Sequence, residues 1–185
     1  MAPCSLTSGR RIPCKDTVGG LKTIWLTTSG IGVNDLTLGS DGEITAIAGN
    51  DISVMQYDLK GNNSLSTAIQ SSPENGTVFF ESTLTVQLPK LLKEDLKELK
   101  LIAFSRPKIF IQTRNNDVLF MGHIHGCELS GSIESGTAFG DFNGINMTFL
   151  SQEKVPPQFV LLANATDADP FAGDNDITVT YGAAV

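Results

Sequence analysis

The stretch TVFFESTLTVQL, residues 77–88, decides the fold class of this chain. On a β-strand successive side chains point to opposite faces, so a period of two separates a buried face from a solvated one. The expected core face carries Val78, Phe80, Ser82, Leu84, Val86 and Leu88, and the other face carries Phe79, Glu81, Thr83, Thr85 and Gln87. The sequence therefore predicts a long strand with one side against a core.

Other runs rich in β-branched residues, or with the same alternation, predict more strands. They are expected at residues 21–28, 43–48, 52–60, 64–72, 108–113, 118–121, 126–133, 145–150 and 177–181. Turn signals separate several of them, among them Pro73-Glu74-Asn75-Gly76 and Asn115-Asn116-Asp117.

A single helix is expected at residues 93–105. Leu92, Leu96, Leu99 and Ala103 recur with helical spacing and form one apolar stripe that should face the core. Arg106-Pro107 should end the helix, because a residue before proline is disfavoured in the helical region. The predicted fold is therefore mainly β: an antiparallel β-sandwich or half-open barrel with one flanking α-helix.

The 185 residues suffice for one domain with its own core. We divide the chain into an N-terminal arm (1–15), a β-sandwich domain (16–158) and a C-terminal extension (159–185). The extension contains an acidic loop and a last strand, which should pair either with a distant strand or with another subunit.

Charge and composition exclude some functions. The chain has 13 Lys plus Arg against 20 Asp plus Glu, a formal net charge of -7, and no basic patch for gripping phosphates. No apolar run approaches the roughly 20 residues that span a bilayer, and no secretory signal is recognisable, so we expect a cytosolic origin and no membrane partner. Three cysteines without close pairing argue against a disulfide framework.

Metal-binding residue types gather in one short segment. His123, His125 and Cys127 would share a face if the segment were extended, but another donor would be needed to complete a metal shell. The acidic loop with Asp167, Asp169, Asp174 and Asp176 offers oxygen ligands for calcium without the spacing of an EF-hand. In both places a structural or solvated role is the favoured interpretation, so no metal site is predicted.

Motifs for catalysis are missing from the sequence. It contains neither a Gly-x-Ser-x-Gly elbow nor a glycine-rich phosphate loop followed by Lys-Ser/Thr. We therefore expect a protein that is not an enzyme and has no cofactor.

Several turns and strand edges together resemble a family of small virion proteins of tailed bacteriophages, including phages of Bacteroidetes-type hosts, with a tail-tube-like fold. The resemblance covers about residues 14–160, and its motifs are CKDTVGGL (14–21), YDLKG (57–61), IQSSPENGT (69–77), LKL (99–101), GTAFGD (136–141) and QEK (152–154).

This resemblance implies a structural subunit that forms stacked hexameric rings, the tube through which the genome leaves the capsid. The protein would then be assembled in the host cytoplasm and reside in the virion tail. Its partners would be copies of itself, other tail or neck proteins, and genomic DNA that passes without specific binding. A neck, ring or tail-terminator component of the same particle is the alternative, and a metal-binding module is a more distant one.

An acidic tube lining would repel DNA phosphates and let the genome slide. The polar segment 51–70 makes a poor core and suits a lumen or an inter-subunit strand. The candidate residues for the lumen or for contacts between subunits are Asp51, Asp58, Lys60, Asn63 and Glu74. The arms at both ends are expected to clasp neighbouring subunits by adding strands to them.

Overall fold

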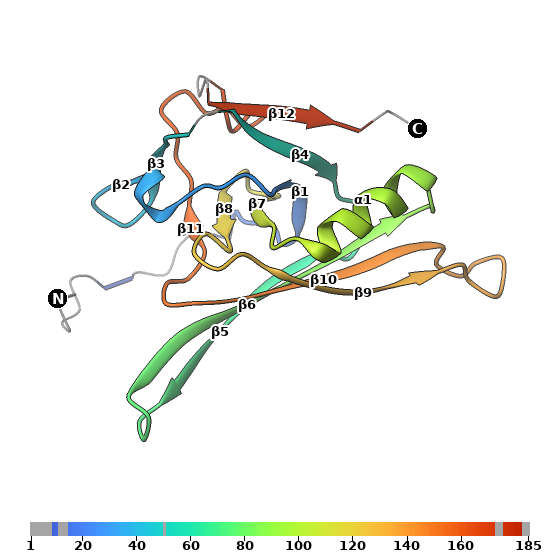
Figure 1. Ribbon diagram of the computed structural model, residues 1–185, viewed down its shortest axis with the longest axis horizontal. Helices are drawn as coiled ribbons and strands as arrows, with labels where there is room; N and C mark the ends of the chain where they lie inside the picture. The colour runs from blue at the N-terminus through green and yellow to red at the C-terminus, as the bar shows by residue number, and fades with distance from the viewer. Residues whose placement is uncertain (1–8, 11–14, 50, 173–175, 183–185) are drawn as a thin grey trace.

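The computed structural model describes residues 9–10, 15–49, 51–172 and 176–182. Its body consists of two large β-sheets, a short two-stranded ribbon and one helix, and a long hairpin projects from it (Figure 1). The elements are β1 (Leu21–Thr27), a 3-10 turn (Val33–Asp35), β2 (Leu36–Leu38), β3 (Ile44–Ile47), β4 (Ile52–Asp58), β5 (Ser64–Ser72), β6 (Thr77–Pro89), α1 (Lys93–Phe104), β7 (Lys108–Thr113), β8 (Val118–Met121), β9 (Glu128–Glu134), β10 (Gly144–Glu153), β11 (Gln158–Phe159) and β12 (Ile177–Tyr181).

The larger sheet has six strands in the order β11-β8-β7-β1-β4-β12. Its central strands β1 and β7 pair antiparallel and are buried on both faces, which explains their nearly continuous apolar sequences. On β1, for example, Ile24 and Trp25 are both buried but belong to different core clusters.

The smaller sheet has four antiparallel strands in the order β5-β6-β10-β9. One of its faces packs on the larger sheet, and between them lies a core that includes Leu84, Val86, Met147 and Phe149. Ser82, Leu84 and Val86 are buried, as the alternation in residues 77–88 predicts, but the prediction is wrong at Val78, which is 57% exposed because it lies beyond the end of the second sheet. The structure thus confirms the β-sandwich with one flanking helix.

A second core covers the opposite face of the six-stranded sheet. Phe110 stacks on Phe120 with ring centroids 4.2 Å apart, and Phe171 meets Phe110 edge-on at 5.1 Å. The β2–β3 ribbon, residues 160–172 and Ile177 close this core, to which Val160, Leu162 and Phe171 also contribute. The segment expected as a C-terminal extension therefore supplies core side chains, and β12 pairs in parallel with β4 of its own chain.

Helix α1 lies where the sequence predicts it, but it is rotated about its axis. Ile102 is its buried residue and Leu99 packs against the first core, whereas Leu96, expected on the core face, is 43% exposed. The predicted stripe is wrong at Leu96 and also at Ala103, which is exposed, because the helix turns only a narrow edge inward. None of the described helices is long and apolar enough to cross a membrane.

Candidate assembly surfaces

The outer face of the four-stranded sheet is mainly polar. The pairing register places three carboxylates on it, together with many hydroxyl and amide side chains and no basic group. Its main polar members are Ser64, Ser66, Gln70, Glu81, Thr83, Thr85, Gln87, Glu128, Ser130, Ser132, Glu134, Asn146, Thr148 and Gln152. Phe79 and Leu150 are its large apolar side chains, and Leu150 is 37% exposed. Such a face binds water and repels anions.

The carboxylates on this face are held by neighbours. Glu81 accepts a hydrogen bond from Gln152 Nε2 at 2.7 Å, and Glu134 accepts one from Asn146 Nδ2 at 2.8 Å. Glu128 instead forms an exposed ion pair with Arg106 at 3.0 Å. Two of the three negative charges thus keep only neutral partners among these contacts, and the face stays acidic.

Both edges of this sheet are open within the described part of the chain. The edge strand β5 has nine residues, SLSTAIQSS, none of them charged or proline. The other edge, β9, has glutamates only at its two ends. Natural proteins usually protect exposed edges with lysine, proline or a bulge, because a bare edge pairs with another strand. The two edges are therefore ready positions for strand pairing between molecules.

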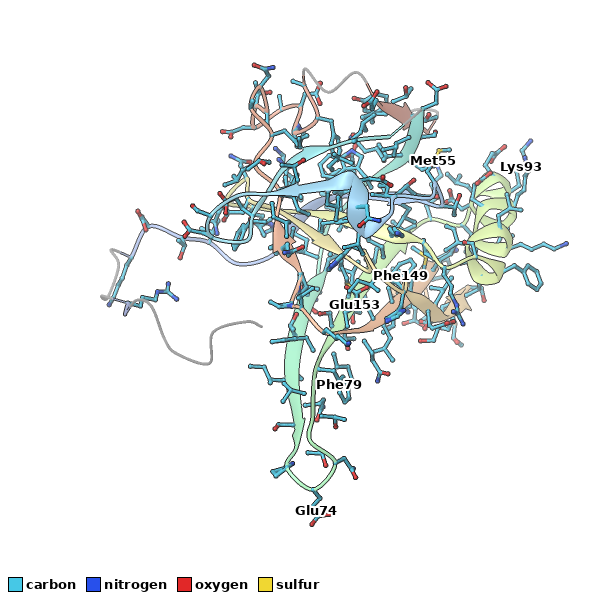
Figure 2. The ribbon with its side chains drawn as sticks, turned by 60° about the vertical axis from the view of Figure 1, so that its left-hand side comes forward. Met55, Glu74, Phe79, Lys93, Phe149 and Glu153 are labelled. Carbon is cyan, nitrogen blue, oxygen red and sulfur yellow. The ribbon has the colours of Figure 1, made fainter. Side chains whose placement is uncertain are left out.

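The β5–β6 hairpin extends beyond the sandwich (Figures 1 and 2). Strand β10 ends at Glu153, opposite Phe80, so the outer part of the hairpin is a two-stranded ribbon that closes in the predicted turn at residues 73–76. On the face that continues the core side, Ile69 is 68% exposed and Val78 is 57% exposed. These apolar side chains lack the second sheet that covers the inner half of β6.

A buried polar cluster fixes the base of this hairpin. The Oε1 atom of Glu153 accepts hydrogen bonds from the backbone N–H groups of Ile124 at 2.7 Å and His125 at 3.1 Å. Its Oε2 atom lies 3.0 Å from Nδ1 of buried His123, near enough for an ion pair although off the line of a good hydrogen bond. Burial alone would raise the pKa of Glu153, but His123 and the two N–H groups outweigh it and lower that pKa.

Lys108 extends the cluster toward the second core. Its Nζ donates to the carbonyl oxygen of His123 at 2.8 Å and also to that of Ile31. Burial lowers the pKa of Lys108, while Glu153 and Asp35 oppose that shift. The cluster joins four separate segments of the chain. It therefore has a structural role and is not a site open to ligands.

The metal candidates His123, His125 and Cys127 do not converge. Their segment is a turn and not an extended strand, because Gly122 and Gly126 take left-handed backbone conformations with φ of 77° and 74°. His123 and Cys127 are buried, whereas His125 is exposed. The acidic side chain that contacts His123 is Glu153, which comes from β10. Among the described residues no three His, Cys, Asp or Glu side chains are placed to hold a metal ion; Asp174 lies outside them.

The lumen candidates lie on separate parts of the molecule. Asp51 and Asp58 are exposed at the two ends of β4, Lys60 is exposed in the following link, and Glu74 lies at the hairpin tip (Figure 2). Asn63 is only 6% exposed, because its Oδ1 accepts from Gln87 N–H at 2.8 Å and its Nδ2 donates to the Lys60 carbonyl. Asn63 therefore cannot line a lumen. The polar surface that extends across β5, β6, β9 and β10 is a further candidate, and the sequence analysis did not predict it as one continuous surface.

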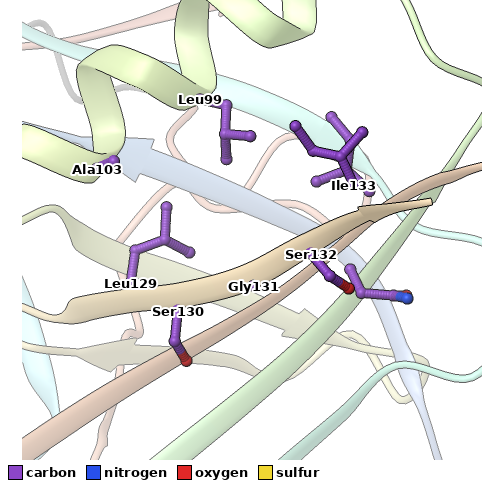
Figure 3. A pocket seen from close by; sticks show the side chains of 9 residues that line it. Leu99, Ala103, Leu129, Ser130, Gly131, Ser132 and Ile133 are labelled. Atoms are coloured by element: carbon purple, nitrogen blue, oxygen red, sulfur yellow. The ribbon is translucent and has the colours of Figure 1, made fainter.

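A small pocket of about 300 Å³ separates α1 from β9 (Figure 3). Leu99 and Leu129 point into it, while Ser130 lies on the opposite side of the strand. Its lining offers no charged group, so it is a packing gap beside the outer sheet.

Comparisons with protein-family models, with curated proteins and with solved structures found no match for this chain.

Proposed function

We propose that this chain is the self-assembling subunit of a bacteriophage tail tube. The observation that carries the proposal is the four-stranded sheet, which combines two unprotected edges with an uncovered polar, acidic face. If β5 of one copy pairs with β9 of the next, the sheets continue around a ring and no edge is left. The resemblance of the sequence to tail-tube-like virion proteins supports the same assembly.

A ring built this way leaves an open channel. Six copies would supply 24 strands, and with strands about 4.8 Å apart and tilted by about 40° the backbone barrel would be roughly 50 Å wide. Barrels of 16–18 strands already enclose water-filled channels. The outer face of each sheet would line this channel, and Glu81 and Glu134 of every copy would repel DNA phosphates and prevent adhesion.

The hairpin would provide the contact between one ring and the next. Its apolar side chains Ile69 and Val78 protrude past the sandwich, where a neighbouring ring can bury them. Pairing at the edges would therefore close each ring, and hairpin contacts would stack the rings. The assembled protein would belong to the virion tail and would meet neck and other tail proteins at the ends of the tube.

Electron microscopy of the purified protein tests the proposal. Long tubes are the expected result, whereas single closed rings would favour the neck, ring or terminator role, and persistent monomers would refute both. A charged edge should prevent ring closure, so we expect Ser66→Lys/Ala68→Lys on β5 to remain monomeric and folded. Ala168→Lys adds a lysine at an exposed position in the loop between Leu162 and Phe171, away from the edges of the four-stranded sheet. It is the control and should assemble normally.

A further inference from the structure

An open trough runs between α1 and β4. It consists of two adjoining cavities of about 690 and 220 Å³ that share Met55, Tyr57 and Glu98. The helix lines it from Leu92 to Ile102, turn after turn, and the far end of the larger cavity is formed by Tyr181 of β12. The trough lies on the six-stranded sheet and is distinct from the polar face of the other sheet.

The trough combines an apolar floor with an acidic wall. Met55 is 41% exposed and Tyr181 is 67% exposed, beside Tyr57. Asp95 and Glu98 project from α1 over this floor, and no Lys or Arg of the described residues forms an ion pair with either, although Glu94 next to them pairs with Lys93 at 3.4 Å. Burial, followed by the charges of Glu98 and Asp95, raises the pKa of Tyr57 to about 12. The trough thus suits a cationic chain with apolar side chains.

Residues 1–15 have this chemistry. They contain Arg10, Arg11 and Lys15 and no acidic residue, and Ile12-Pro13 follows the two arginines. The helix beside the trough has 12 residues and is therefore about 18 Å long. At about 3.3 Å per residue, roughly six residues of extended chain span that length. The segment 9–14, GRRIPC, matches the trough in length, charge and apolar content.

The described residues directly before β1, 15–20, lie on the β7 side of that strand. Strand β1 lies between β7 and β4, and Val18 N–H donates to Asn115 Oδ1 at 3.0 Å, in the turn that follows β7. The chain thus departs from β1 on the side opposite β4 and the trough. This direction favours an arm that reaches another copy.

We propose that the arm, residues 1–15, of one copy binds in the α1–β4 trough of a second copy, with its arginines against Asp95 and Glu98 and its apolar residues on Met55 and Tyr181. The inference rests on the proposed self-assembly and specifies a contact between subunits that is separate from edge pairing. It is a heterologous contact, since arm and trough are different surfaces, and such contacts can propagate along a tube.

Binding of a labelled peptide tests the contact without requiring tubes. A fluorescein-labelled peptide of residues 1–18 is titrated into dilute full-length protein and followed by fluorescence anisotropy. We expect saturable binding that weakens as salt rises. Because two ion pairs worth about 0.7 kcal/mol each would be lost, Asp95→Asn/Glu98→Gln should weaken binding about tenfold. Asp167→Asn, at an exposed carboxylate outside the trough, is the control and should bind as the unchanged protein does.

Charge exchange makes the test specific. Asp95→Lys/Glu98→Lys should reject the natural peptide and accept a peptide carrying Arg10→Glu and Arg11→Glu, provided that thermal unfolding shows that the variant is folded. Equal binding of the peptide to all variants would overturn the proposal. The absence of peptide binding would also overturn it, and this is the result expected if each arm occupied the trough of its own chain. Tubes that form despite this result would leave the tail-tube function intact, whereas peptide binding by a protein that never assembles would refute that function alone.

Discussion

Replacing Glu153 by glutamine should destabilise the fold measurably at neutral pH. The glutamine oxygen can still accept from the N–H groups of Ile124 and His125, but both bonds lose their charge, and His123 loses its anionic neighbour. A hydrogen bond to an ionised group contributes about 1 kcal/mol more than a neutral one, so the two bonds together predict a loss of about 2 kcal/mol. With an m-value of about 2 kcal/mol per molar urea, the unfolding midpoint should fall by about 1 M.

The same variant should change the pH dependence of stability. Because the pKa of Glu153 lies below its ordinary value of 4.5 in the folded protein, its contribution is complete above that value and disappears as pH falls through the lowered pKa. The gap between the natural chain and Glu153→Gln should therefore be widest near pH 7 and narrow in acid. Urea unfolding at several pH values between 7 and 3 measures it.

Glu81→Gln is the matched control, since Glu81 lies on the outer face of the same sheet and accepts one side-chain hydrogen bond. This substitution should change the free energy of unfolding by less than about 0.5 kcal/mol. A gap for Glu153→Gln no larger than the control's, or one that stays constant down to pH 3, would refute the proposed role of the buried carboxylate.

Other perturbations probe the two cores. Phe149→Ala should lower the free energy of unfolding by about 3–5 kcal/mol in a urea titration, because the ring is fully buried between the sheets. Deleting residues 167–185 removes Phe171 and Ile177 from the second core, so we expect a much lower melting temperature; an unchanged one would contradict this packing. Burial raises the pKa of Cys127 to about 12, so with the other two cysteines replaced by serine the native protein should resist a thiol reagent at pH 8 and react once unfolded.

Local signals explain why much of the fold was predictable. The alternation in residues 77–88 and the turn at residues 73–76 depend on neighbours in sequence, and both are found in the structure. Strands β2 and β11, with three and two residues, are too short to leave such a pattern. The parallel pairing of β12 with β4 joins segments more than 100 residues apart, which no local pattern encodes.

The candidate surfaces were harder to predict, because they depend on which strands become neighbours. Asn63 lies two residues after Gly61 in a polar link, which indicates exposure, yet the sheet register brings Gln87 N–H to its side chain and buries it. Glu153 contacts His123 only because β10 ends beside the 122–126 turn. The polar side of residues 77–88 is visible in the sequence, but its continuation across β9 and β10 requires the pairing order.

The projecting hairpin has a consequence for following assembly in solution. A two-stranded ribbon with no third strand or second layer is marginally stable in water, so amides near the tip should exchange with deuterium quickly in a lone molecule. Contact with another copy would slow that exchange, while amides of β1 and β7, buried on both faces, would stay protected in either state. The deuterium exchange rate of residues 70–79 therefore reports contact with another copy, independently of folding.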